Sequence, residues 1–410
     1  AANWLTGISL SQMPPEGALR RLHERLSGGA TGYELRASGV AAAQPVQLAL
    51  TVDGQLTGVQ YSLSDIAEGM AAVQPLWAQA LTGDALEQST EQALAAALTE
   101  PCCALLRYHG AIPLSAVAGW TGSSRKADGA LAAETLVYAA QSGQLFVRAA
   151  DGTLYSAPTR VEEAVLAAAQ QDFRGQRCRF AGADGTVCPE TLLFERETLT
   201  LPLLATSGID LFGQQSSTGL EDVLAAFSFT AYSAFYAEQN DAVRVFVDNV
   251  STLRVSAGGL LQFAATGADS AVRAYDEGEV SGAAALDAQL DRARLILDKV
   301  MQAADTGTHA SLYAVQQAEG RTTLVFVQMY GGVPVLGEHD LATFTFQDGA
   351  LLSATIRLQR FTAEGLSRTV LPAVQAAASG GGRSLMVVYR PQQDGTLAPM
   401  RVFLRQAQAA

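Results

Sequence analysis

Asp-Gly pairs recur between runs in which apolar and polar residues alternate, and this feature constrains the fold more than any other. The pairs begin at Asp53, Asp128, Asp151, Asp184, Asp348 and Asp394. Asp-Gly favours a tight hairpin turn because both residues tolerate positive φ angles. Strands joined by such turns must be antiparallel. The sequence therefore predicts an α+β fold of antiparallel sheets, each covered by helices, in two domains.

The clearest helix in the sequence covers residues 282–301. Apolar residues fall at helical spacing on one face, at Leu286, Leu290, Leu297 and Val300, and Asp287, Asp291, Arg294 and Asp298 lie opposite them. The apolar stripe needs a sheet to pack on. We expect that sheet to present Leu324, Phe326 and Tyr330, or Val325 and Val327 from the other face of the same strand.

Other elements follow from the same patterns. Hairpins are expected at residues 48–61 and 136–158, around Asp53-Gly54 and Asp151-Gly152. Helices are expected at residues 15–26, 64–82, 84–99, 114–120 and 161–169. A segment rich in Ser, Gly and Gln, residues 207–218, predicts a boundary between a domain at 1–210 and a domain at 219–410. We expect the second domain to fold alone.

Composition limits the classes of partner. The net charge of -13 over 410 residues argues against nucleic acid, which requires a basic face. No window reaches about 18 consecutive apolar residues, so the sequence as given predicts no membrane-spanning helix. The chain begins at Ala1 instead of Met. The simplest interpretation is that an upstream signal or membrane anchor has been removed.

Motifs for catalysis and metal binding are incomplete. His23-Glu24 starts an HExxH-like pattern, but Ser27 stands at the position of the second histidine. The S-x-x-K spacing at residues 123–126 lacks the partner motifs of acyl-transfer enzymes. His339-Asp340 is interpreted as an exposed loop pair. We therefore expect no catalytic residues, no metal ligands and no cofactor.

The four cysteines allow two interpretations. Cys178 and Cys188 flank an Asp-Gly turn, so paired strands could bring them together as a disulfide of an exported chain. The alternative, which the sequence favours, is that Cys102, Cys103, Cys178 and Cys188 are small buried apolar residues.

Several segments, in order along the chain, resemble the YycH/YycI family of extracytoplasmic regulators of a sensor histidine kinase. Residues 243–263 read VRVFVDNVSTLRVSAGGLLQF, as two short strands closed by a turn at Gly258-Gly259, and residues 219–241 resemble the helix before this hairpin. Residues 330–356 contain GGVPV, a strand unit shared with PepSY-like modules. Residues 111–122 (AIPLSAVAGWTG) and 387–403 (VVYRPQQDGTLAPMRVF) resemble two further family elements. Met400-Arg401 stands where the family usually has Trp, which leaves the packing of that strand open.

This resemblance implies a function. It implies a non-enzymatic protein, anchored by an N-terminal helix on the outer face of the cell membrane, that binds a sensor histidine kinase and a related regulator protein. YycH is the better match in size, and YycI in the C-terminal half. The alternative is a PepSY-like inhibitor or chaperone of a secreted peptidase, because the GGVPV unit is common to both groups.

The GGVPV segment also has two interpretations. Proline lacks an N–H donor, so Pro334 belongs at a strand end, an edge or a bulge. A structural bend is the interpretation favoured here. The functional alternative is an exposed edge that accepts a strand of a partner, with Tyr330, Val333, Pro334 and Val335 as the binding residues.

Overall fold

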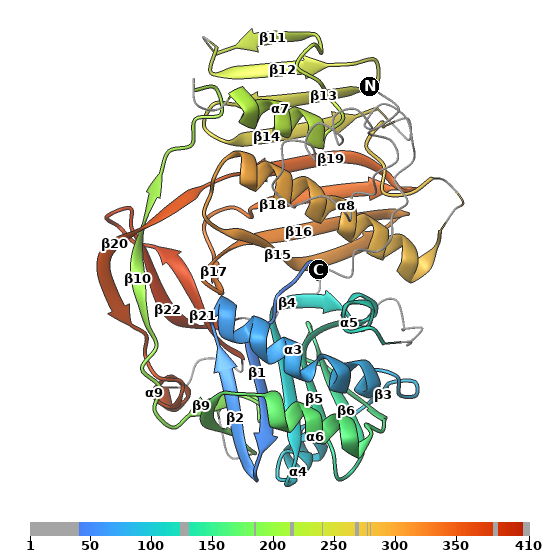
Figure 1. The fold of residues 1–410 in the computed structure, drawn as a ribbon, viewed down its shortest axis with the longest axis vertical. Helices are drawn as coiled ribbons and strands as arrows, with labels where there is room; N and C mark the ends of the chain where they lie inside the picture. Colours follow the sequence, from blue (N-terminus) through green and yellow to red (C-terminus); the bar gives the residue numbers. More distant parts are fainter. Residues whose placement is uncertain are drawn as a thin grey trace, which may run out of the picture. The chain divides into compact units, whose positions relative to one another are not determined.

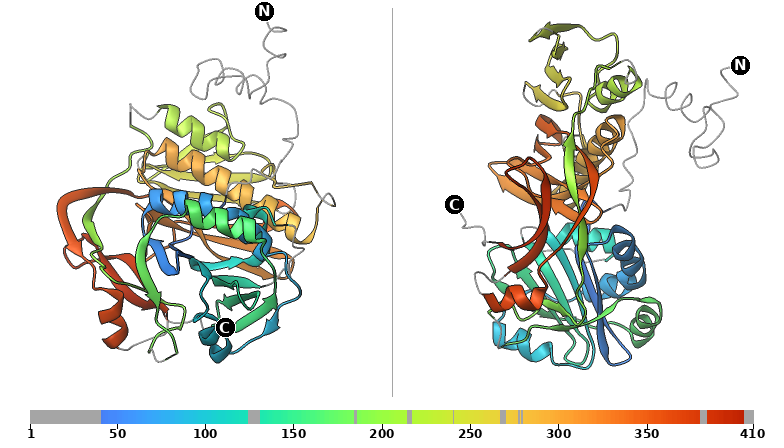
Figure 2. Two further views of the ribbon diagram at one scale, coloured as in Figure 1. Left: turned by 60° about the horizontal axis from the view of Figure 1, so that its bottom comes forward. Right: turned by 90° about the vertical axis from the view of Figure 1, so that its left-hand side faces the viewer.

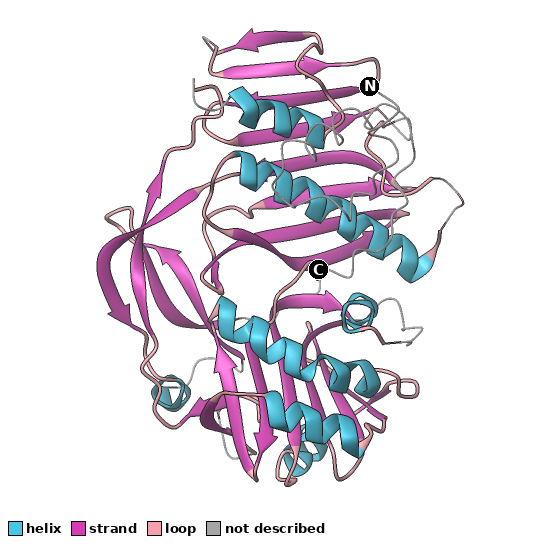
Figure 3. Cartoon of the chain, in the orientation of Figure 1, coloured by secondary structure: helices cyan, strands magenta, loops and turns pink. Residues whose placement is uncertain are grey.

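A computed structural model describes residues 41–123, 131–183, 186–213, 217–239, 241–266, 270–276, 278, 280–379 and 384–404. In this described part, strands form a nine-stranded and a 13-stranded sheet, with helices packed on them (Figures 1 and 3). The pairs are antiparallel except β17 with β21. The predicted α+β class is therefore confirmed. The expected helix at residues 15–26 lies outside the described residues.

The first sheet has the order β3-β7-β6-β5-β4-β1-β2-β8-β9. Its strands are β1 (Gln47–Val52), β2 (Gln55–Gln60), β3 (Glu87–Gln88), β4 (Cys103–Pro113), β5 (Ala132–Ala139), β6 (Gln144–Ala149), β7 (Leu154–Pro158), β8 (Gln176–Phe180) and β9 (Leu192–Phe194). Asp53 and Gly54 adopt φ angles of 50° and 71°, as a tight hairpin turn requires. The hairpin predicted there is confirmed by the pairing of β1 with β2.

Four helices accompany this sheet: α3 (Leu63–Ala80), α4 (Glu91–Ala97), α5 (Leu114–Thr121) and α6 (Glu163–Asp172). α3 begins where the Ser62 hydroxyl accepts the N–H of Asp65, and it buries Val73, Leu76 and Trp77. The helix expected at residues 84–99 is wrong in its first half. Residues 87–88 pair with β7 as strand β3, so the helix starts only after the cap at Thr90.

The second sheet has the order β11-β12-β13-β14-β19-β18-β16-β17-β21-β22-β10-β20, with β15 paired to β16. Its strands are β10 (Thr200–Ser207), β11 (Phe235–Glu238), β12 (Val243–Val247), β13 (Ser251–Ser256), β14 (Leu260–Ala265), β15 (His309–Ala318), β16 (Arg321–Tyr330), β17 (Val333–Val335), β18 (Ala342–Gln347), β19 (Ala350–Arg357), β20 (Arg360–Thr369), β21 (Ser384–Pro391) and β22 (Leu397–Leu404). Residues 243–263 thus contribute three strands, one more than expected.

Helices α7 (Ser217–Ala226) and α8 (Gly282–Ala303) lie side by side over the second sheet, and α9 (Ala373–Ser379) packs near β21 (Figures 1 and 3). Leu290 of α8 is 1% exposed and shares a core cluster with Leu324 and Phe326. The predicted packing of α8 on these two residues is confirmed. Tyr330 and Val327 instead belong to a separate cluster around β17.

The polar side of α8 is less exposed than the sequence suggested. Asp291 is only 8% exposed, so its expected place on the solvent face is wrong. The reason is that α5 packs against α8, and a Cβ atom at Gly119 would lie 3.6 Å from the Oδ2 of Asp287. Burial, and after it the neighbouring Asp291 carboxylate, raise the pKa of Asp287 to about 6.

The two sheets share a core and backbone hydrogen bonds. One cluster of buried side chains includes Leu48 and Leu106 of the first sheet and Phe344 of the second. The N–H of Leu312 donates to the carbonyl of Ala42 at 2.8 Å. β10, which precedes the predicted boundary at residues 207–218, pairs with β20 and β22 of the second sheet. Independent folding of residues 219–410 stays a prediction.

Figure 2 shows the two sheets from two further sides. Figure 2 shows β10, β20, β21 and β22, which are the part of the second sheet beyond β17, to one side of the strands that α7 and α8 cover. None of the helices in the described residues is long and apolar enough to cross a membrane.

The packing of α8 predicts a difference between two leucines on the same helix. Leu290→Ala should lower the free energy of unfolding by about 2 to 5 kcal/mol, because burial is lost and a cavity remains. The matched control is Leu295→Ala. Leu295 is 39% exposed, so its substitution should change stability by no more than about 0.5 kcal/mol. Urea denaturation measures the free energy of unfolding of both variants. Equal losses would contradict the placement of Leu290 in the core between α8 and the sheet.

The position of Asp287 predicts a pH dependence. Its pKa is raised in the folded chain, so folding favours the protonated carboxyl and the folded state loses stability as pH rises from about 4 to about 6. Asp287→Asn should therefore stabilise the protein at pH 7 and change it little at pH 4. Denaturation midpoints across this range test the effect. A lower midpoint for Asp287→Asn at pH 7 would contradict it.

Candidate functional site

β17, the GVPV segment, lies inside the second sheet and not at its edge. It pairs antiparallel with β16, where Tyr330 faces Val333, and parallel with β21, where Val335 faces Tyr389. Val333 is 0% exposed and Val335 is 7% exposed, and Pro334 is buried between them. The alternative of an exposed edge at these residues is wrong, because strands occupy both sides of β17. Their role in partner binding stays a prediction, but strand addition at β17 would require β21 to leave.

The turn before β17 packs against the first sheet. Gly331 and Gly332 have φ angles of 59° and 93°, which favour glycine. A Cβ atom at Gly332 would lie 2.9 Å from the backbone nitrogen of Leu63, the first residue of α3. The hydroxyl of Tyr61, just before α3, accepts the N–H of Val387 in β21 at 2.9 Å. Only glycine, which has no side chain, allows the backbone at residue 332 to lie this close to the backbone of Leu63.

The side chains around β17 form a cluster that we call the junction. It links the second sheet to the ends of β1 and β2, which Val46 and Tyr61 flank, and its buried members are Val46, Tyr61, Leu204, Val327, Met329, Val333, Val335, Phe361, Val370, Met386, Val387, Val388, Tyr389 and Leu397. The rings of Tyr330 and Tyr389 meet edge to face at 6.0 Å. Burial raises the pKa of Tyr389. The GVPV residues are therefore structural residues of this junction.

A pocket of about 260 Å³ opens where β17 ends. Val335 forms part of its wall, and the exposed residues Glu338, His339 and Asp340, which begin three positions further along the chain, also line it. Gln328 is held in place by donating to the Thr308 hydroxyl at 2.5 Å and to the Gln359 carbonyl at 2.6 Å. Burial raises the pKa of Asp340, against the opposing effect of His339. The pocket offers a polar rim around an apolar wall.

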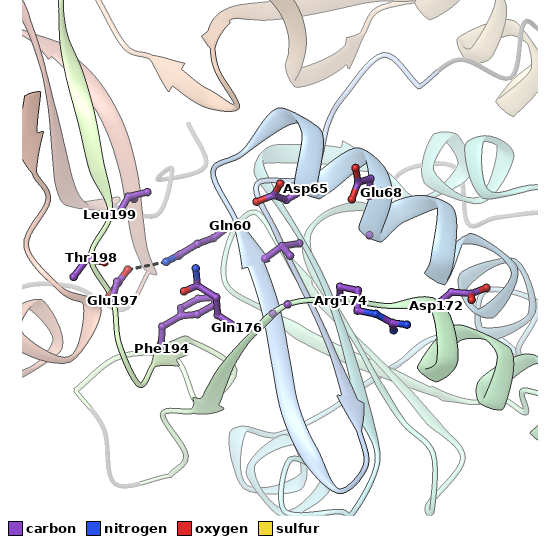
Figure 4. A pocket seen from close by; sticks show the side chains of 14 residues that line it. Gln60, Asp65, Glu68, Asp172, Arg174, Gln176, Phe194, Glu197, Thr198 and Leu199 are labelled. Carbon is purple, nitrogen blue, oxygen red and sulfur yellow. Dashed lines mark hydrogen bonds between the residues drawn. The ribbon is translucent and has the colours of Figure 1, made fainter. Parts of the chain in front are cut away.

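A second pocket, of about 310 Å³, lies between α3 and the segment that leads into β10 (Figure 4). Glu197 on its wall accepts from Gln60 at 2.8 Å and from the N–H of Ala373 at 2.5 Å, and it forms an ion pair with Arg401. The side chains of Glu197 and Arg401 are each 2% exposed. Arg401 stands where the resemblance left the packing open, and the structure shows it buried and paired. Glu197 therefore connects three elements: β22 through Arg401, α9 through Ala373 and β2 through Gln60.

The rest of the second pocket is polar and open. Asp65, Glu68 and Asp172 are exposed carboxylates around it, and Arg174 donates to the backbone carbonyls of Gln171 and Phe173. Among the described residues, no group of three or more His, Cys, Asp or Glu side chains is placed to hold a metal ion.

All four cysteines are free thiols in the structure. Cys178 faces Phe194 across β8 and β9, and it is not bonded to Cys188. Burial raises the pKa of Cys178 to about 12 and that of Cys188 to about 11. Thiols with such pKa values are poor nucleophiles at neutral pH. These residues act as small buried side chains.

Two histidines lie where the sheets meet, which the sequence did not indicate. His109 of β4 is 2% exposed, and its ring lies 5.8 Å from that of Tyr313 in β15. Burial, and after it the charge of His309, lower the pKa of His109 to about 3. A Cβ atom at Gly110 would lie 2.1 Å from the carbonyl oxygen of Tyr313, so glycine is required for this contact. His109 is a neutral core residue.

An exposed aromatic edge was also missed by the sequence analysis. The helix expected over residues 219–241 ends at Ala226, and the later residues form β11. Tyr232 is 98% exposed, and Phe235 and Tyr236 are each 53% exposed. The available signal was the aromatic-rich run YSAFYAE, which is typical of a strand.

Comparison with known proteins yields one structural match to report. No protein-family model matches the chain, and no curated protein matches it. Among solved structures, the crystal structure of YycH from Bacillus subtilis matches with a TM-score of 0.48 and 12% sequence identity. The match covers 87% of this chain and 95% of the YycH chain. YycH belongs to the family that the sequence segments resemble.

The Glu197–Arg401 ion pair predicts a strong loss of stability when one partner is removed. Arg401→Met should lower the free energy of unfolding by about 3 to 5 kcal/mol, because Glu197 stays buried and charged without its partner. The double variant Glu197→Gln, Arg401→Met should recover much of this loss. Glu195→Gln, at a neighbouring exposed position, is the control and should have little effect. If the double variant lost as much free energy of unfolding as Arg401→Met, the unpaired charge of Glu197 would not be the cause of the loss.

Proposed function

We propose that this chain is a non-enzymatic, extracytoplasmic regulator that binds a sensor histidine kinase. The observation that carries the proposal is the way the family-like segments assemble. The GVPV strand β17 pairs with β21 from the VVYRP segment, and both meet Tyr61 at the junction. Segments that are far apart in sequence and resemble one family thus form one structural unit.

The exposed residues next to this unit are the proposed contact surface. The GVPV side chains are buried, so a partner would meet the residues that follow them, Glu338, His339 and Asp340, and the pocket beside β17. Two carboxylates at an exposed loop can steer a basic partner and orient it. The chain as a whole carries a net charge of -13, which adds to this steering.

The location and further partners are part of the same proposal. We propose that the chain acts on the outer face of the cell membrane, through an anchor upstream of Ala1, and that a related regulator protein shares the kinase. The support for both is the sequence resemblance.

The second candidate is a PepSY-like inhibitor or chaperone of a secreted peptidase. It is favoured by the same GVPV strand, which PepSY-like modules share. A sensor kinase gene beside this gene supports the first candidate, and a peptidase gene beside it supports the second.

Binding to the outer domain of the sensor kinase of the same organism tests the proposal. The intact chain should bind that domain in biolayer interferometry. The double variant Glu338→Arg, Asp340→Arg should bind at least tenfold more weakly, chiefly through a lower association rate. Glu319→Arg with Glu364→Arg makes the same charge change at exposed residues elsewhere and should reduce binding less.

Several outcomes would overturn parts of the proposal. No binding of the intact chain to the kinase domain, together with inhibition of a secreted peptidase, would replace it with the second candidate. Equal losses in both double variants would remove the 338–340 loop from the contact. Val335→Lys is not a useful probe of binding, because a lysine at this buried position should unfold the junction.

A further inference from the structure

β11 is the edge strand at one end of the second sheet (Figure 1). It pairs with β12 on one side, and no other described strand pairs with it. An edge strand exposes a row of backbone N–H and C=O groups that can pair with another chain. β11 has no proline, no lysine and no bulge, so its only protection is its length of four residues and the charge of Glu238, which is paired with Arg254 of β13.

The register shows which backbone groups are free. The N–H of Val247 donates to the carbonyl of Ala234 at 2.9 Å, one step from the pair of Phe235 with Phe246. Hydrogen-bonded and non-hydrogen-bonded pairs alternate in an antiparallel ladder. Tyr236 and Glu238 therefore bond to β12. The N–H and C=O groups of Phe235 and Ala237 point to the free edge.

The side chains of β11 are held in defined positions. The Phe235 ring lies 5.3 Å from that of Phe246, on the sheet face covered by α7 and α8. The guanidinium of Arg244 lies 4.2 Å from the ring centre of Phe212 and 6.0 Å from that of Phe235. Tyr236 is on the opposite face, because side chains alternate along a strand. Such ordering lowers the entropy cost of binding.

We propose that β11 is the interface of a homodimer in which two copies pair their β11 strands antiparallel about a twofold axis at Tyr236. In this register, Phe235 of one copy forms both backbone hydrogen bonds with Ala237 of the other, and the symmetric pair repeats them. The two Tyr236 residues form the central non-hydrogen-bonded pair. The two second sheets then become one continuous sheet.

Among the twofold registers that the outward groups of Phe235 and Ala237 allow, the one centred on Tyr236 gives the best side-chain fit, and this fit favours a second copy over another strand. A large side chain, Phe235, faces a small one, Ala237, so the pair fits without overlap on the helix-covered face. Glu238 faces Ala234, so no two like charges meet. The two Tyr236 rings lie side by side on the other face. Twofold interfaces of this kind match the same patch on both subunits.

The size of the interface predicts its strength. Tyr232, Phe235 and Tyr236 are 98%, 53% and 53% exposed. Burying them on both copies, together with the strand backbone, removes on the order of 1,000 Å² from solvent. This area is at the low end for specific complexes. The dimer should therefore be weak and depend on protein concentration.

A cysteine crosslink tests the register. In the central non-hydrogen-bonded pair, Cα atoms lie about 4.5 Å apart, within the range of a disulfide. Tyr236→Cys should therefore give a disulfide-linked dimer under mild oxidation. Tyr232→Cys, at a more exposed position four residues from the axis, should give none above the wild-type background. Equal crosslinking at both positions, or none at position 236, would overturn the proposal.

A proline substitution tests the hydrogen bonds. Ala237→Pro removes an N–H that points to the free edge, so it should leave the thermal midpoint nearly unchanged. It should raise the dimer dissociation constant at least tenfold in sedimentation equilibrium. Ala237→Ser keeps both the N–H and a small side chain and is the matched control, with dimerisation retained. A dimer that Ala237→Pro does not weaken would place the interface elsewhere.

The homodimer goes beyond the proposed function and does not rest on it. A wild-type chain that stays monomeric at all concentrations would overturn the homodimer. If that monomer also lost kinase binding on Ala237→Pro, the edge would be assigned to a partner strand. Loss of dimerisation with unchanged kinase binding would support both proposals as separate surfaces.

Discussion

The insertion of β17 between β16 and β21 is the constraint on which the rest of the structure depends. Three residues, Val333–Val335, connect antiparallel hairpins on one side with the β21–β22 pair on the other. The turn before them reaches the start of α3 because Gly332 has no side chain. If this strand were displaced, the second sheet would divide between β16 and β21, and the contact of the Gly332 turn with α3 would be lost.

Buried polar contacts hold this arrangement at points where apolar packing alone would not specify it. Glu197 and Arg401 connect β2, α9 and β22. Arg107 of β4 donates to the Ser384 hydroxyl of β21 at 2.6 Å. A buried charge without its partner is costly, so each pair selects one relative position of its elements. The two sheets are thereby fixed to each other by directional contacts as well as by a shared core.

This organisation separates residues that hold the fold from residues that can meet a partner. The family-like GVPV side chains are in the first group. The loop at residues 338–340 and the aromatic edge at β11 are in the second, and they belong to different parts of the second sheet. A partner at the loop and a second copy at the edge would therefore not compete for the same backbone groups.

Local patterns in the sequence determined the α+β class and many of the elements. Asp-Gly turns predicted the antiparallel hairpins, and helical spacing predicted α8 with Leu290 on its buried face, because both depend on neighbouring residues. Tertiary structure alone decided the environment of each face. Asp291 is buried by α5, and β17 is buried by β21, although α5 and β21 are far away in the sequence. An edge strand and an inner strand can have the same sequence pattern. Only the segments that pair with the strand, which are distant in the sequence, distinguish the two positions. For that reason the sequence left open an exposed edge at Val333 and Val335 as the alternative to a structural bend, and the structure places an exposed edge at Phe235 and Tyr236.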